Sequence, residues 1–277
     1  MKSEYNCFSW KKVYLKKNRN FVKVCYNIKM EIEKIKICTW NCLGPRKDTE
    51  TEMNIWIEKI KWLKENFKAD MYVIQECSKA QVDYIRGTKS GWNYAAWYGD
   101  EIDWFMRGTA IFSDKRYFTE REEFFHNSKF RYVVPYRIKT EKLNFILFNV
   151  WTKAKPQNPE YEREAYFFYE NNVKEALKYY DSRGYLDKAL LVGDFNFGRS
   201  VSEIKSFGEI LDKYGFSLSD GVTDTLVTYH HNNGKYYFND ICYGKNLKIT
   251  LSKKGDFEDS GNISDHIPLI FEITSVH

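Results

Sequence analysis

The stretch Ala189-Leu190-Leu191-Val192-Gly193-Asp194-Phe195-Asn196 places an acid and an amide directly after a short apolar run. Such a run is typical of a buried β-strand, and catalytic loops gather where strands of a rigid scaffold end. Asp194 and Asn196 are two positions apart, so in an extended chain they face the same way. Together they could hold a water and a phosphate oxygen at one rim of a sheet.

Four other strand-like runs also have an acid, an amide or an imidazole at one end. They are Ile35–Trp40 before Asn41, Met71–Gln75 before Glu76, Tyr236–Asn239 before Asp240, and Ile267–Ile273 after Ser264-Asp265-His266. Each polar residue alone also suits an ordinary role as a solvated carboxylate, a turn former or a cap. Their repeated placement at strand ends favours a shared functional rim.

The remaining periodicity predicts an α+β fold of two mixed β-sheets packed together, with helices outside. Further strands are expected at Gly108–Phe112, Tyr132–Ile138 and Phe145–Val150, and a hairpin is expected to join Thr225–His231 to Lys235–Tyr243 through Asn232-Asn233-Gly234. Helices are expected at Thr51–Asn66, at Glu160–Tyr180, and from a Ser202 cap to Tyr214, where Gly215 follows. No Pro-, Ser- or Gly-rich linker divides residues 30–277, which predicts one domain.

The net charge of +5 is unevenly distributed along the 277 residues. Residues 1–29 hold eight Lys or Arg and one acid, whereas residues 30–277 hold 35 basic and 37 acidic residues. The basic character therefore belongs to the leader and is not an electrostatic footprint of the folded body. We expect residues 1–29 to be a loosely held basic arm, or the natural chain to start at Met30.

The leader lacks the apolar run of a secretory signal, and no segment has the ~18 consecutive apolar residues of a membrane helix. The six cysteines form no C-x-x-C pair, and most lie inside apolar runs. This pattern predicts free, buried thiols in a reducing, cytoplasmic compartment. No membrane span and no protein partner are implied.

Oxygen-rich residue types at the rim indicate a hard cation such as Mg²⁺, which takes one or two carboxylates together with waters and substrate phosphate. Glu76 and Asp265 are the candidate ligands. His266 is a candidate for contact with the scissile phosphate, and Asp240 would fix its tautomer and raise its pKa.

Five segments occur here in the order seen in the endonuclease/exonuclease/phosphatase superfamily, which this sequence resembles from about residue 35 to 273. They are Thr39-Trp40-Asn41, Ile74-Gln75-Glu76, Gly108-Thr109-Ala110-Ile111-Phe112-Ser113, Gly193-Asp194-Phe195-Asn196 and Ser264-Asp265-His266-Ile267-Pro268-Leu269. The resemblance implies a four-layer α/β/β/α sandwich with the active site at one end of the two sheets.

The resemblance also implies a role for each rim residue. Glu76 would bind Mg²⁺ (or Mn²⁺) with Asn41 beside it, and Asp265 would serve a metal. Asp194 would orient or deprotonate the attacking water, and Asn196 would hold a phosphate oxygen. His266, oriented by Asp240, would stabilise charge on the phosphoryl oxygens.

One position departs from the pattern of the superfamily. After Phe145–Val150 many members place a His that contacts the phosphate, but this chain has Trp151. Tryptophan offers one N–H donor and cannot act as an acid. Either Lys153, Arg107 or another donor compensates, or the indole stacks on a base or sugar, or Trp151 only packs.

Three functions remain open at this stage. A Mg²⁺-dependent nuclease on DNA or RNA is favoured by the aromatic and basic residues expected near the rim, which are Trp151, Lys153, Lys155, Tyr161, Arg163 and Arg199. The alternatives are a phosphatase or phospholipase-type enzyme on inositol phosphates or another small or lipid phosphoester, and a non-catalytic binding module. Clustered carboxylates are costly without a metal or partner, which argues against the last.

Overall fold

The computed structural model describes residues 8–17, 20–29, 34–44, 49–87, 92, 94–99, 107–113, 117–122, 132–152, 169–196, 201–223, 226–230, 236–237, 240–260 and 263–275. The chain divides into two compact units, Met1–Glu33 and Lys34–His277. In the first unit, β1 (Phe8–Lys17) and β2 (Asn20–Lys29) form an antiparallel ribbon. The boundary expected between residues 29 and 30 stays a prediction.

The second unit contains two six-stranded sheets. One has the order β11-β14-β10-β9-β8-β7 and the other the order β15-β16-β3-β4-β6-β5. The strands of the first sheet are β7 (Phe118–Arg121), β8 (Tyr132–Lys139), β9 (Asn144–Trp151), β10 (Ala189–Asp194), β11 (Ser217–Leu218) and β14 (Asp240–Lys245). Those of the second are β3 (Ile35–Asn41), β4 (Met71–Ser78), β5 (Tyr94–Gly99), β6 (Arg107–Ser113), β15 (Leu247–Lys254) and β16 (Leu269–Ser275).

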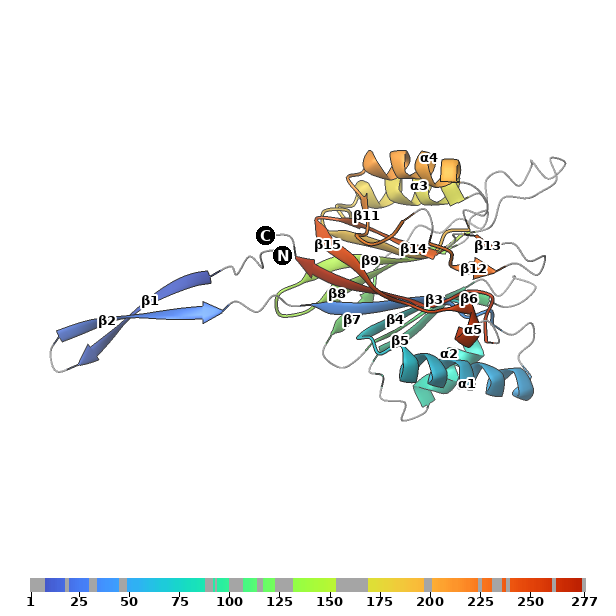
Figure 1. Ribbon diagram of the computed structural model, residues 1–277, viewed down its shortest axis with the longest axis horizontal. Coiled ribbons are helices and arrows are strands. Elements are labelled where there is room, and N and C mark those ends of the chain that lie inside the picture. Colours follow the sequence, from blue (N-terminus) through green and yellow to red (C-terminus); the bar gives the residue numbers. More distant parts are fainter. Residues whose placement is uncertain are drawn as a thin grey trace. The chain divides into compact units, whose positions relative to one another are not determined.

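Helices cover the outer faces of both sheets, with α1 and α2 on one side and α3 and α4 on the other (Figure 1). Their bounds are α1 (Glu50–Asn66), α2 (Lys79–Gly87), α3 (Tyr169–Asp181) and α4 (Val201–Asp212), with a short α5 (Phe257–Ser260). The sheets are mixed: β3–β4 and β9–β10 pair in parallel, and the other neighbouring strands are antiparallel. The predicted four-layer α+β sandwich is confirmed.

The layers are held together by two apolar clusters. The larger includes Val73, Ile111, Phe148, Leu191 and Phe271, all 0% exposed, from strands of both sheets. The smaller contains Trp40, Ile74 and Phe112 together with Trp56 of α1, which joins the helical layer to its sheet. α1 begins after the Thr49 cap, whose hydroxyl accepts the Glu52 N–H at 3.3 Å. Each large apolar side chain that is buried in this way stabilises the folded protein by roughly 1.5–3 kcal/mol.

Two expected elements differ from those in the structure, and a third is described only in part. α4 begins at Val201 and ends at Asp212, so Ser202 lies inside the helix and is not its cap. The described part of α3 begins at Tyr169, and residues 160–168 lie outside the described residues. The predicted strand Lys235–Tyr243 is two strands: β13 (Tyr236–Tyr237) pairs with β12 (Tyr229–His230), whereas β14 joins the large sheet beside β10. Asn232-Asn233-Gly234 lies outside the described residues.

Buried polar side chains link the two sheets beneath the rim. The Gln75 amide nitrogen donates to the Asn149 amide oxygen at 3.0 Å. The Asn149 amide nitrogen donates in turn to the backbone carbonyls of Ile74 and Ala110, at 3.3 and 2.9 Å. Because Gln75 and Asn149 are 0% exposed, these bonds satisfy groups that would otherwise be costly to bury, and they set how the two sheets face each other.

Gly193 of β10 lies opposite Val150 of the parallel strand β9, and it has φ +140°. A Cβ at this position would lie 2.1 Å from the Val150 carbonyl oxygen. We expect Gly193→Ala to lower the free energy of unfolding by about 2–4 kcal/mol, since backbone strain and a backbone clash add. Urea unfolding would measure it. Gly208→Ala in α4 is the control, because a Cβ there meets nothing within 4 Å and alanine favours helix. If Gly193→Ala were as stable as the wild-type protein, the backbone strain and clash expected for a side chain at position 193 would be contradicted.

Candidate active site

The strand register brings the predicted polar residues to one end of the two sheets. Asn41 ends β3 and lies opposite Gln75 of the parallel strand β4. Asp194 ends β10 and lies opposite Asp240, the first residue of the antiparallel strand β14. Arg107 begins β6, opposite Ser78 at the end of β4. At this edge β3, β4 and β10 end, and the strands antiparallel to their neighbours, β6 and β14, begin. Residues far apart in the sequence therefore meet there.

Glu76 occupies a bulge within β4 and does not follow the strand as expected, since β4 continues to Ser78. The pairing of β4 with β6 shifts between Gln75 and Cys77, and Glu76 has φ +56°. A non-glycine residue in this left-handed region carries strain that is often stored at functional sites. The bulge turns the Glu76 carboxylate to the rim, where it pairs with Arg107.

The Asn41 amide connects two of the predicted carboxylates. Its nitrogen donates to Glu76 Oε1 at 3.0 Å and to Asp194 Oδ2 at 2.9 Å. Its oxygen accepts the backbone N–H of Leu43 at 3.1 Å. An amide between two carboxylates must present its N–H groups to them, because the oxygen would repel both. In this arrangement Asn41 positions Glu76 and Asp194, and its role as a metal ligand stays a prediction.

Asp194 and Asn196 are joined by a tight turn and not by an extended chain. Asn196 has φ +51°, and its backbone N–H donates to Asp194 Oδ1 at 2.9 Å. Its amide nitrogen donates to Asp194 Oδ2 at 2.9 Å and to the Thr152 carbonyl at 2.7 Å. The extended geometry expected from their spacing was wrong, because the side chain of Asp194 binds its own backbone two residues on. Both amide hydrogens of Asn196 are engaged, so its predicted phosphate contact would require one of these bonds to break.

Asp194 is 1% exposed, and burial raises the pKa of its carboxyl to about 7. His266 nearby and the N–H donors of Asn41 and Asn196 oppose this shift by favouring the charged form. A carboxylate with a pKa near neutrality suits a general base, because about half of it is ionised at pH 7 and the ionised form readily takes a proton.

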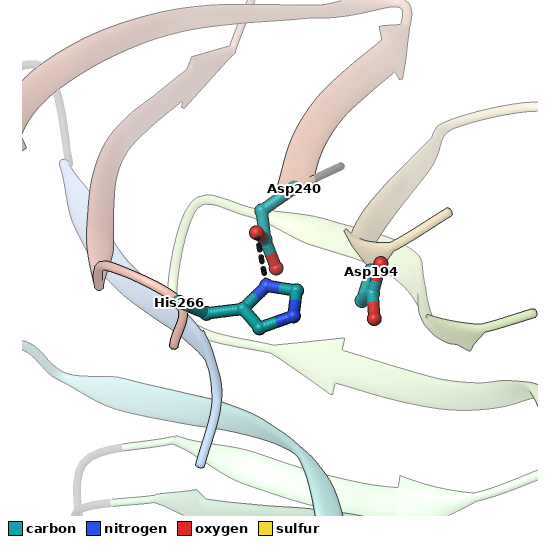
Figure 2. Close-up of side chains that lie close together, drawn as sticks. All are labelled: Asp194, Asp240 and His266. Carbon is teal, nitrogen blue, oxygen red and sulfur yellow. Dashed lines mark hydrogen bonds and ion pairs between the residues drawn. The ribbon is translucent and has the colours of Figure 1, made fainter. Parts of the chain in front are cut away.

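His266 and Asp240 form a buried pair. His266 Nδ1 lies 2.7 Å from Asp240 Oδ2, and the two residues are 4% and 0% exposed. Burial lowers the pKa of His266, but the Asp240 carboxylate beside it, with Asp194 and Asp265, raises it to about 10. The imidazole is therefore held as a cation at neutral pH. Figure 2 shows the imidazole between Asp240 and Asp194, with its second nitrogen on the side of Asp194.

The backbone around this pair is firmly anchored. The Asp240 N–H donates to the Thr228 hydroxyl at 2.9 Å, and the Trp40 indole donates to the His266 carbonyl at 2.9 Å. The Tyr229 ring packs against the imidazole with centroids 4.6 Å apart. Hydrogen bonds and packing from three elements thus fix the orientation of His266.

Asp265 lies beside Ser264, which binds the same network. The Ser264 hydroxyl donates its one hydrogen to the Asn41 carbonyl at 2.8 Å, and its oxygen lies 3.5 Å from Asp265 Oδ1. Ser264 therefore lies between Asp265 and Asn41, whose amide binds Glu76. The direct coordination of a cation by Glu76 and Asp265 stays a prediction.

The described residues contain another possible cation site. One ligand atom from each of Asp194, Asp240 and His266 lies within 4.8 Å of the others. Two observations disfavour it: His266 Nδ1 is bonded to Asp240, and the Asp194 carboxylate accepts three N–H bonds, two of them at Oδ2. Glu76 is better suited, because each of its oxygens accepts one bond and keeps a second lone pair for a cation.

The predicted substrate-contacting residues differ in placement. Arg107 lines a cavity of about 300 Å³ with Leu43 and Lys59, beside its ion pair to Glu76. Trp151 ends β9, is 7% exposed, and packs on the Tyr132 ring at 5.5 Å between centroids. Both substrate contacts stay predictions. Five further residues, Lys153, Lys155, Tyr161, Arg163 and Arg199, lie outside the described residues.

Several positioning residues were missed by sequence reasoning. Thr152 accepts the Asn196 amide through its carbonyl and holds the Phe195 carbonyl through its hydroxyl. Lys59 of α1 donates to the carbonyls of Cys42 and Leu43, at 2.9 and 3.0 Å, and so holds the loop that orients Asn41. A lysine on a helix and a threonine after a strand carry no pattern that marks such roles.

Comparison with known proteins supports the fold. No protein-family model and no curated protein matches the sequence. The 3'-5' exonuclease NExo from Neisseria meningitidis has a TM-score of 0.60 at 17% identity, covering 86% of this chain and 98% of that one. A humanised TDP2 from D. rerio has 0.62 at 13%, covering 87% and 99%. An endonuclease/exonuclease/phosphatase family protein from Bacteroides thetaiotaomicron has 0.60 at 14%, covering 89% and 100%.

These structures match over almost their whole lengths. Together with the rim geometry, they show that this chain has the fold of the endonuclease/exonuclease/phosphatase superfamily.

Proposed function

We propose that this chain is a metal-dependent phosphoric ester hydrolase, and specifically a nuclease that hydrolyses DNA or RNA by in-line attack of an activated water. The observation that carries the proposal is the Asn41 amide, which joins Glu76 to Asp194 through bonds of 3.0 and 2.9 Å. A candidate metal ligand and a candidate base are thereby held within reach of one phosphate group.

Glu76 and Asp265 would hold the cation. Their carboxylate oxygens are the hard donors that Mg²⁺ or Mn²⁺ prefers, and Glu76 retains lone pairs beyond its bonds to Asn41 and Arg107. When bound, such a cation acts as a Lewis acid that polarises a phosphoryl oxygen. The residues present therefore fit a magnesium or manganese cofactor.

Asp194 would orient the attacking water and take its proton. Its ties to Asn41 and Asn196 hold the carboxylate in one orientation, which spares the entropy of positioning a base during the reaction. Its pKa of about 7 keeps it ionised in a large share of molecules at neutral pH.

His266 would neutralise negative charge that develops on the phosphoryl oxygens. The Asp240 carboxylate holds its Nδ1, so the second ring nitrogen remains to donate to substrate. A fixed charge in a site of low dielectric stabilises a transition state more than the same charge in water does. Asp240 acts through His266 and is a positioning residue.

Two proteins of similar structure favour nucleic acid as the substrate. NExo is described as a 3'-5' exonuclease, and TRAS1, with a TM-score of 0.55 at 16% identity, as the endonuclease domain of a telomere-specific retrotransposon. Cys38, Cys42, Cys77 and Cys242 are free and buried, which supports a reducing, cytoplasmic compartment. Among the described residues, no helix is both long and apolar enough to cross a membrane.

A phosphatase is the second candidate. A second structure of the Neisseria enzyme is described as a 3' phosphatase bound to product DNA hairpin, so one fold of this kind is associated with both reactions. Phosphatase or phospholipase-type activity on inositol phosphates or lipid phosphoesters is the more distant alternative.

A substrate panel tests the proposal. Purified protein would be incubated with plasmid DNA, an abasic oligonucleotide, RNA, a 3'-phosphorylated oligonucleotide and phosphoinositides, each in EDTA, Mg²⁺ or Mn²⁺. We expect cleavage of a nucleic acid that EDTA abolishes and either cation restores. Hydrolysis of the phosphoinositides alone would overturn the nuclease, and full activity in EDTA would overturn the metal dependence.

A further inference from the structure

A cavity of about 300 Å³ lies beside the candidate metal ligand Glu76. Apolar and positively charged side chains line it together, namely Leu43, Ile55, Trp56, Lys59 and Arg107. Arg107 pairs with Glu76, so the cavity adjoins the rim at which we expect the phosphate to bind. Its volume is at the lower end of the roughly 300–1,000 Å³ usual for small-molecule sites, which leaves room for one small organic group.

Leu43 is held at this cavity in a strained backbone conformation. It has φ +45°, a region that non-glycine residues rarely adopt, and it is 39% exposed. The Asn41 side chain accepts its N–H at 3.1 Å, and the Lys59 ammonium donates to its carbonyl at 3.0 Å. Strain of this kind persists only where the surroundings fix it, and it clusters at ligand sites. An exposed apolar side chain fixed in this way beside a polar rim indicates a contact with a ligand.

The loop after β3 and helix α1 are tied together around the cavity. The Trp56 indole donates to the Cys42 sulfur at 3.3 Å, and Lys59 donates to the Cys42 carbonyl at 2.9 Å. Gly44 lets the loop lie directly on β4, since a Cβ there would be 1.8 Å from the Glu76 carbonyl oxygen. The walls are therefore formed before a ligand arrives, which reduces the cost of ordering them on binding.

The positive charge at the cavity suits a phosphate. Two of the three Lys59 N–H groups bind the carbonyls of Cys42 and Leu43, and among the residues that the structure describes none accepts the third. Burial lowers the pKa of Lys59, and the Asp265 and Glu76 carboxylates are among the groups that oppose this shift. The ammonium thus lies near both candidate metal ligands, with one hydrogen left for a charge-assisted bond to a phosphate oxygen.

We propose that this cavity is a nucleoside subsite, in which Leu43 and Ile55 contact the base next to the scissile phosphate and Lys59 binds a phosphate of the same nucleoside. Every base has an apolar face, so such a contact accepts DNA or RNA whatever its sequence. A lipid chain is the other apolar substituent of a phosphoester, but it would remove water from two cations without offering them an acceptor. This inference rests on the proposed nuclease function and names the place at which its substrate is held.

Exposed apolar residues of the chain provide matched variants. Leu43→Ala and Ile55→Ala each remove part of an apolar wall. Both positions are exposed, and alanine favours the helix at position 55, so both variants should fold. Leu218→Ala is the control, because Leu218 is also 39% exposed but lies on the edge strand β11 of the other sheet.

Isothermal titration calorimetry of the full chain in EDTA measures binding without turnover. The probes are thymidine 3',5'-bisphosphate and deoxyribose 3',5'-bisphosphate, which differ only in the base. We expect the wild-type protein to bind the thymidine probe at least about 10-fold more tightly, and Leu43→Ala and Ile55→Ala each to weaken that binding by about 5-fold. Neither variant should change the affinity for the base-free probe, and Leu218→Ala should change neither affinity.

Three results would overturn the proposal. The wild-type protein could bind both probes equally or neither, or Leu43→Ala and Leu218→Ala could bind the thymidine probe equally. In the third, Leu43→Ala would weaken binding of dihexanoyl phosphatidic acid and not of the nucleotide, which would assign the cavity to an alkyl chain. Base-dependent binding by a chain that cleaves no nucleic acid would contradict the nuclease and not the subsite. Cleavage by a protein that binds both probes equally would contradict the subsite alone.

Discussion

Asp194→Asn is expected to reduce phosphodiester hydrolysis by about 10²- to 10⁴-fold, the usual effect of removing a general base. Asparagine keeps the size of the side chain but cannot accept a proton at neutral pH. Binding of substrate should change much less, because the Glu76 carboxylate and the His266–Asp240 pair remain. Single-turnover rates on the best substrate of the panel, with Kd measured separately, would show a loss confined to the chemical step.

The Asp194 variant needs a check of folding. Both Asp194 oxygens accept N–H bonds, so an asparagine must present its own N–H₂ group to Asn41 or to Asn196. This mismatch costs about 1–3 kcal/mol, the desolvation penalty of an unsatisfied group. Near-UV circular dichroism should still show native packing. Asp212→Asn, at the exposed end of α4, is the control. A natively packed Asp194→Asn with wild-type rates would remove Asp194 from the mechanism.

Glu76→Gln is expected to weaken Mn²⁺ binding by at least about 10-fold, and activity at limiting metal should fall with it. Loss of a direct carboxylate ligand should cost no less than the 10- to 100-fold typical of outer partners of a metal site. The glutamine can still accept the Asn41 amide, so the network toward Asp194 is largely preserved. Electron paramagnetic resonance of free Mn²⁺ gives the Kd without an activity assay.

Glu122→Gln is a matched control for Glu76→Gln. Glu122 also pairs with an arginine, Arg137, but it follows the edge strand β7 of the other sheet. Both variants break a Glu–Arg pair and remove one negative charge. Only Glu76→Gln should change the Kd for Mn²⁺, and equal weakening by both variants would indicate a general charge effect in place of coordination.

The sequence predicted the rim well where an apolar run ended in a single polar residue. Asn41 and Asp194 end β3 and β10 as expected, whereas Asp240 begins β14 and does not follow a strand. Because β14 is antiparallel to β10, its first residue lies at the same edge as Asp194. Apolar runs predict buried strands well, because a strand that is buried on both faces requires apolar residues along its length. The order of the layers followed from the excess of strands over helices.

Local departures of the backbone from regular strand geometry could not be predicted from the sequence in the same way. The bulge at Glu76 and the left-handed Asn196 are single-residue changes that leave the hydrophobic pattern almost unaltered. The division of Lys235–Tyr243 between β13 and β14 depends on which sheet each half meets. The Gln75–Asn149 tie between the sheets likewise depends on packing between segments 74 residues apart. None of these is encoded in short-range spacing.

The central claim is that a cation held by Glu76 and a base provided by Asp194 act on the same phosphate. Anomalous diffraction from crystals soaked in Mn²⁺ tests it most directly. The account predicts a manganese peak bonded to a Glu76 oxygen, with Asp265 nearby and the His266–Asp240 contact intact. A peak bonded instead to Asp194, Asp240 and His266, with Glu76 still bound only to Asn41 and Arg107, would contradict it.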